Sequence, residues 1–292
     1  MRRAQRVLLW VAVLVLAVIV FAALWPGVLA THDPLQTAVR SALLPPSAEH
    51  LFGTDQSGRD VYSRVIYGAG RSLGIGLLAT GVALVVGLVI GALAGVAPKG
   101  IDTTVMRVND VLMAFPEFLV ALVVVAVLGP GPVNIAIAVT LAAVPVYIRL
   151  ARVQTQTLRV AEHVEAARIL GVPRVRAFTR HVVPGVLGAL SVLATIGIGS
   201  SILAAAGLSF LGLGPSEPTP EWGLMLAGGR NVLGQAWWIS LFPGIAITLT
   251  VVSATVLAPV FLWRRAGQAA AWLLVLIGAV YLGYFLAVRS AP

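Results

Sequence analysis

Histidine and serine side chains are the first places to look for catalytic chemistry in this chain. The four histidines (His32, His50, His163 and His181) fall in predicted loops or at predicted helix ends, and none forms an H-E-x-x-H pair or a comparable metal-ligand spacing. The serines at 200–201 lie in an apolar segment, and no apolar segment holds a histidine or lysine that could activate them. We interpret them as a helix-packing site and expect neither an enzyme active site nor a metal centre.

Nucleotide binding and thiol chemistry are excluded by residue type. The chain has no cysteine, so it has neither disulfides nor a cysteine-ligated metal. Its only lysine, Lys99, lies in an Ala-Pro-Lys-Gly sequence and not in G-x-x-x-x-G-K-[ST], the phosphate-binding loop. We therefore expect that the chain does not bind ATP itself and carries no cofactor.

Two acidic residues could act on a solute within an apolar segment. Glu117 follows Pro116 in such a segment, and Asp110 lies one to two helical turns earlier. Glu117 could line a transport pathway or pair with an arginine of a partner, or it could face a water-filled cavity without a specific role, and the sequence leaves these alternatives open. No second buried acid or base stands ready as its relay partner, which argues against an ion-driven carrier.

The composition of the chain indicates what kind of secondary structure holds these residues. Of 292 residues, 59% are hydrophobic and only 11% are charged, whereas a soluble globular chain has about 25% charged residues. The mean hydropathy is +0.97. A soluble domain of this size could not bury so much apolar surface, and a disordered chain would be less apolar, so we predict a membrane protein.

Apolar segments of about 20 residues are expected to cross the bilayer as helices. The sequence predicts an all-α polytopic membrane protein with six core transmembrane helices and a further helix near the C-terminus. The first apolar run exceeds the roughly 7–15 residues of a signal-peptide core, so we interpret it as an uncleaved helix. The predicted spans are 7–25, 72–97, 105–129, 132–150, 185–209, 237–263 and 269–288.

Arginine and lysine positions orient these helices. With the N-terminus in the cytoplasm, 14 of the 20 basic residues fall on the inner side and six on the outer side. The net charge of +9 is therefore interpreted as a consequence of topology, which removes the argument for nucleic-acid binding. This orientation gives outer segments at about 31–70 and 210–236 and one long inner loop at 150–184.

Two patterns in this framework predict helix contacts. Gly87, Gly91 and Gly95 share one helical face, where they let another backbone approach, within this chain in our preferred interpretation or on a second membrane subunit. In the inner loop, residues 160–170 have the apolar periodicity of an amphipathic helix, and Gly171 with the proline two residues later predicts its end. This helix could dock into a groove of a soluble partner or lie on lipid headgroups, and residue types alone do not decide.

The inner loop resembles the EAA loop of ABC importer permeases. Glu165-Ala166-Ala167, then Gly171, then Pro184 have the spacing of that motif, although His181 and Val183 replace its usual isoleucine and leucine. In that family the loop forms a coupling helix that sits in a cleft of the ATPase subunit. The resemblance implies that coupling to the ATPase rests on Glu162, Glu165, Ala166, Ala167, Arg168, Gly171 and Pro184.

Further segments resemble the second, C-type permease subunit of the dipeptide/oligopeptide/nickel import family. Residues 52–61 are similar to its GTD-x-x-GRD segment, and 111–116, 206–214, 218–223 and 241–244 match later stretches in order and spacing. We interpret the first segment as a structural turn with a salt bridge in preference to a substrate contact. The motif residues concerned are Gly53, Asp55, Gly58, Arg59 and Asp60.

The resemblance implies a type I importer of the bacterial cytoplasmic membrane. Its expected partners are a second permease subunit, two P-loop ATPase subunits that bind ATP and Mg²⁺, an extracytoplasmic substrate-binding protein, a peptide substrate and membrane lipid. Two alternatives to peptide import are a permease that imports nickel or another small solute and an independent ion-coupled carrier. We expect a first helix with its outer segment at 1–70, the core permease domain at 71–263 and the extra helix at 264–292, an addition to the usual family pattern whose role the sequence leaves open.

Overall fold

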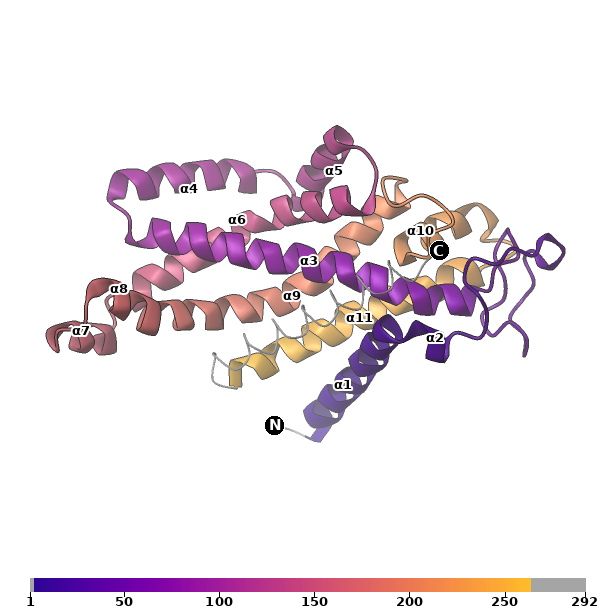
Figure 1. Cartoon of the computed structure of the whole chain (residues 1–292), viewed down its shortest axis with the longest axis horizontal. Helices are drawn as coiled ribbons and strands as arrows, with labels where there is room; N and C mark the ends of the chain where they lie inside the picture. The colour runs from indigo at the N-terminus through magenta and orange to yellow at the C-terminus, as the bar shows by residue number, and fades with distance from the viewer. Residues whose placement is uncertain (1–2, 264–292) are drawn as a thin grey trace.

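Long helices make up most of the chain, as the apolar segments predict. The computed structural model describes residues 3–263, and within them it has no β-strand, only an isolated bridge between Thr54 and Asp60. The helix predicted at 269–288 lies outside the described residues. The long helices are α1 (Arg3–Leu24), α3 (Val61–Val96), α4 (Lys99–Met113), α5 (Glu117–Leu128), α6 (Pro132–Leu158), α9 (Val183–Phe210) and α11 (Trp238–Trp263), and the short ones include α2 (Pro26–Leu29), α7 (Glu162–Ile169), α8 (Arg174–Ala177) and α10 (Trp222–Gly229) (Figure 1).

Five of the described helical segments are long and apolar enough to cross a membrane, and α4 with α5 forms a sixth candidate. These two helices meet at a bend of 88°, so the prediction of one continuous helix at 105–129 is wrong. Pro116 explains the break, because it has no amide hydrogen and disfavours helical geometry in the residue before it. When the bent pair is counted as one span, the described chain has the six core crossings that the sequence predicts.

Three helices extend past the apolar segments that predict them. α3 begins at Val61 and not at 72, so it runs through residue 70, and α6 continues past 150 to Leu158. Ahead of α9, helical structure begins in α8 and passes through a π-helical turn at Phe178–Val182, so the predicted start at 185 is wrong. The wider turn lies directly before Pro184 and accommodates its missing amide hydrogen. Hydropathy marks only the part of a helix that meets hydrocarbon, and it therefore underestimates these polar ends.

The glycine face of α3 packs against α6 within this chain, as our preferred interpretation predicts. A Cβ atom added at Gly87 would collide with Tyr147, and one at Gly91 would collide with the backbone of α6. At Gly95 the added atom would lie 2.8 Å from the Cβ of Thr155. The two backbones therefore approach as closely as small-residue helix pairs allow, and α3 and α6 form the centre of the bundle.

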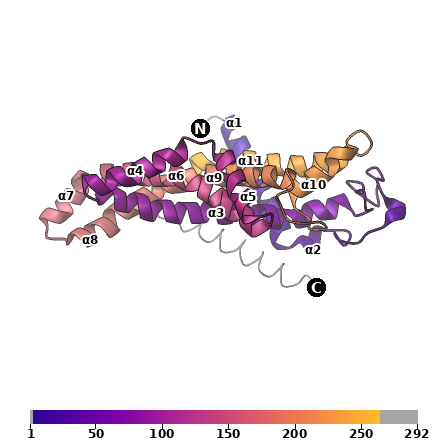
Figure 2. The same cartoon turned by 90° about the horizontal axis from the view of Figure 1, so that it is seen from above.

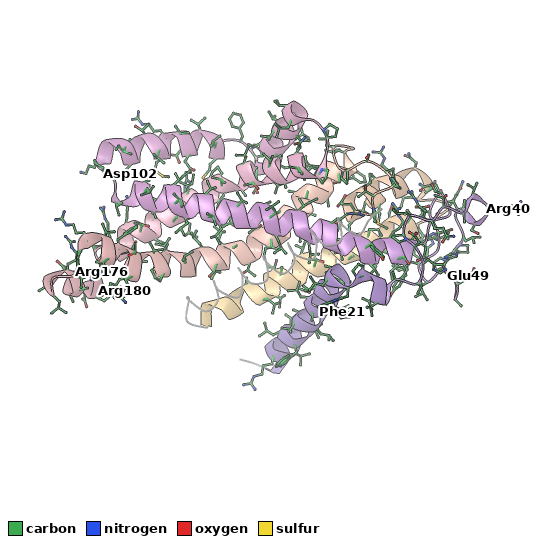
Figure 3. The ribbon with its side chains drawn as sticks, viewed as in Figure 1. Phe21, Arg40, Glu49, Asp102, Arg176 and Arg180 are labelled. Atoms are coloured by element: carbon green, nitrogen blue, oxygen red, sulfur yellow. The ribbon has the colours of Figure 1, made fainter. Side chains whose placement is uncertain are left out.

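The two ends of the bundle carry different polar segments. Helices α7 and α8 lie at one end, whereas α2, α10 and the loop between α2 and α3 lie at the other (Figure 1 and Figure 2). Arg176 and Arg180 mark the first end, and Arg40 and Glu49 mark the opposite one (Figure 3). This arrangement agrees with an inner loop at 150–184 and outer segments at 31–70 and 210–236.

Candidate functional site

The inner end of the bundle presents α7 as a short exposed helix with one buried anchor. Val164 is buried in the same apolar cluster as Val182, and α7 contacts α8 and the π-helical turn that leads into α9. Glu165 and Ala166 face outward. The exposed residues of the predicted coupling motif are Glu162, Glu165, Ala166, Arg168, Gly171 and Pro184, while Ala167 is half-buried.

Gly171 ends α7 as the sequence predicts, through a backbone geometry that favours glycine. Its φ angle is +85°, in the left-handed region. The amide of Gly171 donates to the carbonyl of Arg168 at 3.0 Å, and the amide of Val172 donates to that of Ala167 at 3.1 Å. This pair of bonds is a Schellman motif, which satisfies the last carbonyls of the helix. Apart from its chain neighbours, no described residue has an atom within 4 Å of the position that a Cβ atom would take, so a larger residue would meet backbone strain and no clash with these residues.

An apolar tip lies beside this turn, and the sequence analysis did not predict it. Ile169 and Leu170 are 81% and 84% exposed, and Val175 is also exposed at the start of the next helix. Such a group of large apolar side chains at one end of the molecule is typical of a surface that a partner covers. In the sequence, this tip corresponds to two aliphatic residues directly before the glycine that ends the helix. Helical periodicity alone does not predict whether these two residues are buried or exposed.

Ion pairs connect α4 to the end of α6 that carries α7. Arg152 donates twice to Asp102, from Nε at 2.5 Å and from Nη2 at 2.6 Å, and Arg149 pairs with Asp110 one turn earlier on α6. Asp110, a candidate for an intramembrane role in the sequence, thus has a surface partner. Glu117 is the first residue of α5, directly after the bend, where it is exposed and makes no ion pair with another described residue.

The outer motif is a turn with a salt bridge, in agreement with its interpretation from the sequence. Arg59 Nε donates to Asp55 Oδ2 at 2.7 Å, and Gly53 and Gly58 both have φ +73°. A Cβ atom at Gly53 would lie 2.6 Å from Trp238 Nε1, and one at Gly58 would collide with a neighbouring carbonyl. Asp60 caps α3, because its Oδ2 accepts the amide hydrogen of Ser63 at 2.8 Å.

This turn fastens the 210–236 segment to the bundle, a contact that the sequence did not predict. Arg59 Nη1 donates to Glu217 at 2.7 Å, and the buried Arg64 donates to the carbonyl of Pro218 at 3.0 Å. Gln56 donates to the carbonyl of Gly228 at 2.6 Å. The two outer segments therefore form one lobe.

Glu221 is a further buried acid in this lobe. Its carboxylate accepts the amide hydrogens of Gly223 at 2.9 Å and Leu224 at 2.8 Å, as the N-cap of α10, and the hydroxyl of Ser72 at 3.2 Å. Burial raises the pKa of Glu221, and the two amide donors partly oppose this shift.

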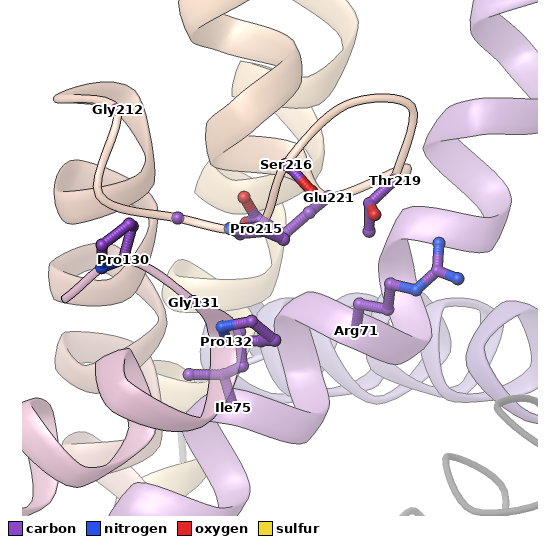
Figure 4. A pocket seen from close by; sticks show the side chains of 11 residues that line it. Arg71, Ile75, Pro130, Gly131, Pro132, Gly212, Pro215, Ser216, Thr219 and Glu221 are labelled. Atoms are coloured by element: carbon purple, nitrogen blue, oxygen red, sulfur yellow. The ribbon is translucent and has the colours of Figure 1, made fainter. Parts of the chain in front are cut away.

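A cavity of about 590 Å³ opens in the outer half, between α3, the turn before α6 and the loop after α9. Its lining includes Arg71, Ile75, Pro132, Thr219 and Glu221, which come from these three segments (Figure 4). The volume is in the range of small-molecule sites. Much of this lining is apolar, and the carboxylate of Glu221 is held by the N-cap bonds of α10.

Known proteins resemble this chain over most of its length. Residues 87–266 match the model of a family described as "Binding-protein-dependent transport system inner membrane component". The chain is 42% identical over 224 residues to the probable D,D-dipeptide transport system permease protein of Escherichia coli (strain K12), over 77% of this chain and 75% of that protein. It is 41% identical to the di/tripeptide transport system permease protein of Pseudomonas aeruginosa (strain UCBPP-PA14), over 82% and 81%. Against the glutathione transport system permease protein of Escherichia coli O6:K15:H31, the identity is 42% over 73% and 70%.

Proposed function

Because the chain belongs to the family of binding-protein-dependent transport system inner membrane components, we propose that it forms half of the translocation pathway of an ATP-driven peptide importer. It is a multi-pass protein of the bacterial inner membrane. In the proposed assembly it pairs with a second permease subunit. Two P-loop ATPase subunits bind ATP and Mg²⁺ on the inner side, and a substrate-binding protein delivers the cargo on the outer side.

The observation that carries this proposal is that α7 lies beyond the apolar part of the bundle on the inner side. α6 continues from the end of its apolar part at residue 150 to Leu158, which is about 12 Å at 1.5 Å per residue. α7 is thereby held beyond the hydrocarbon, which favours docking into a soluble subunit over lying on lipid headgroups. The exposed Ile169 and Leu170 supply apolar surface that a cleft of an ATPase would bury.

The contacts around α7 suit the transmission of a movement into the membrane. A pull on α7 would act on α9 through α8 and the π-helical turn, and Val164 is buried in a core that residues of α6 and α9 share. α6 is packed tightly on α3 along the glycine face, and Arg152 links it to Asp102 of α4. Closure of the ATPase dimer on ATP would draw the coupling helices together, and the long helices would follow as connected bodies.

Peptides are the substrate class that the relatives and the outer cavity favour over nickel. The relatives are named for D,D-dipeptides, di/tripeptides and glutathione. The outer cavity, of about 590 Å³, has room for a small peptide. Glu117, exposed at the bend between α4 and α5, is our further candidate for a residue that lines the pathway.

Affinity purification of the tagged chain from native membranes in mild detergent tests this function. We expect mass spectrometry to identify a second permease and one or two P-loop ATPases, and an accompanying binding protein would provide the ligand to assay. A chain that is recovered alone and transports solute into liposomes without ATP would contradict the proposal and identify an independent carrier.

A further inference from the structure

Two histidines converge on one buried carboxylate at the start of α3. His32 follows α2, His50 lies in the loop that precedes the outer motif, and Asp60 caps α3. The Nδ1 atoms of His50 and His32 lie 2.9 Å and 3.9 Å from Asp60 Oδ1, and the two imidazole rings are 4.8 Å apart between centroids. We call these three residues the outer histidine cluster.

No arginine or lysine in the described part of the chain forms an ion pair with Asp60. Its side chain is only 1% exposed, and among the residues described between 3 and 263 its ion-pair partners are the two histidines. The neighbouring arginines, Arg59 and Arg64, face Asp55 and Glu217 instead. A buried carboxylate costs free energy unless it is paired or coordinates a metal ion. The cluster thus places one anionic oxygen beside two imidazole nitrogens in a buried setting.

The donor set and the spacing fit a divalent transition-metal ion. Imidazole nitrogen and carboxylate oxygen are ligands of Zn²⁺, at about 2.0–2.2 Å, so the donors of a tetrahedral site lie about 3.3–3.5 Å apart. The two distances to Asp60 Oδ1 lie on either side of this value, and one donor atom from each residue falls within 4.8 Å of the others. A small rotation of the His32 ring would shorten the longer of the two distances, and its side chain, 34% exposed, has room to rotate.

The surroundings orient the cluster and keep it open to the outer solution. The backbone amide of His32 donates to Ser63 Oγ at 3.0 Å, and Asp60 Oδ2 accepts from the amide of Ser63. Thr31 Oγ1 lies 3.0 Å from His32 Nδ1 and would have to yield this nitrogen to a metal. Hydrogen bonds of this kind, to groups beside the ligands, hold metal ligands in place, and the exposed edge of His32 leaves a coordination position for water.

We propose that His32, His50 and Asp60 bind a divalent transition-metal ion of the Zn²⁺ type on the outer side of the membrane. The ion fastens the segment after α2 to the first turn of α3 and so stabilises the outer lobe. This site does not depend on what the chain transports. This proposal departs from the expectation, drawn from the sequence, of no metal centre, because the three residues have no metal-ligand spacing along the chain and meet only in the fold.

Zinc binding to the full chain tests the proposal. The chain is purified in detergent with a tag that contains no histidine, treated with a chelator, dialysed and titrated with ZnCl₂, and its metal content is measured by mass spectrometry. We expect one Zn²⁺ per chain and a higher melting temperature, with affinity lowered more than about tenfold in His32→Ala and in His50→Gln. The matched control replaces both inner histidines, His163 and His181, whose rings are 6.4 Å apart, and should bind zinc as the wild type does.

His32→Ala decides the result even if His50→Gln fails to fold, because the partly exposed His32 is the less buried of the two histidines. Co²⁺ gives a second readout, since its visible absorption in the protein should be lost in His32→Ala. Zinc well below one ion per chain would overturn the proposal, and so would equal affinity of the wild type and His32→Ala. In either case the cluster is only a hydrogen-bonded pair of His50 and Asp60.

Discussion

Replacing Gly171 with valine tests how α7 is held at the inner end of the bundle. At φ +85° a residue with a Cβ atom is strained by about 1–2 kcal/mol, and no atom within 4 Å adds a clash. This energy corresponds to a factor of about 5–30 in an equilibrium. The equilibrium constant for forming the Schellman motif, which sets the direction of α7, should therefore fall by this factor, while the transmembrane helices are unaffected.

The assay is ATP-driven uptake of a labelled dipeptide into proteoliposomes that contain the chain with its partner subunits. We expect Gly171→Val to lower uptake, by up to about 30-fold, at unchanged membrane content. Gly171→Asn should retain most of the uptake, because asparagine adopts left-handed geometry more readily than other residues. Gly100→Val is the matched control, since Gly100 also has open space around it but an ordinary φ angle on the same side of the membrane.

Normal uptake by Gly171→Val would refute the role of this turn in coupling. An equal loss in Gly171→Val and Gly171→Asn would refute the conformational reasoning, because both side chains fit the available space and only one tolerates the backbone geometry.

Three further changes follow from the contacts described above. Glu165→Lys, on the exposed face of α7, should uncouple ATP hydrolysis from uptake while insertion stays normal; unchanged uptake at equal membrane content would count against a docking role. Gly87→Leu should lower the melting temperature in detergent, because overpacking the α3–α6 contact costs about 1–3 kcal/mol, whereas Gly100→Leu should not; equal melting temperatures would contradict this contact. Burial raises the pKa of Glu221, so its contribution to stability is fully present below the unfolded value of about 4.3 and is lost as the pH rises through the folded value. The melting temperature of the wild type should therefore fall as the pH rises from the unfolded to the folded pKa of Glu221, and that of Glu221→Gln should fall less. If the two proteins lose melting temperature equally with pH, another group is responsible.

The sequence predicts the crossings better than it predicts their shape. Unbroken apolar runs indicate spans because lipid leaves the backbone few alternatives to helix. The sharp bend before α5 could have been inferred from Pro116, but hydropathy treats its surroundings as one apolar run. The early start of α3 could not be inferred in this way, because the buried Arg64 in its first turn is compensated by groups distant in the sequence, among them Glu217 and the carbonyl of Pro218.

At the candidate sites, the sequence predicts contacts between residues that are near each other in the chain. It does not predict which distant residues pair. Gly171 with its nearby proline predicts the end of α7, and the motif around Asp55 and Arg59 predicts an ion pair four residues apart. The second partner of Arg59 is Glu217, 158 residues away, and no local pattern connects them. The outer histidine cluster is a similar case, since it forms between residues from separate loops.

Cross-linking from α7 tests the central claim most directly, namely that this helix contacts an ATPase subunit. The chain has no cysteine, so Ala166→Cys introduces its only thiol, on the exposed face of α7. With a thiol-specific photo-cross-linker in native membranes, we predict an adduct with a P-loop ATPase that Glu49→Cys, exposed at the outer end, does not form (Figure 3). An Ala166→Cys protein that labels only lipid, or that labels the same partners as Glu49→Cys, would contradict the account.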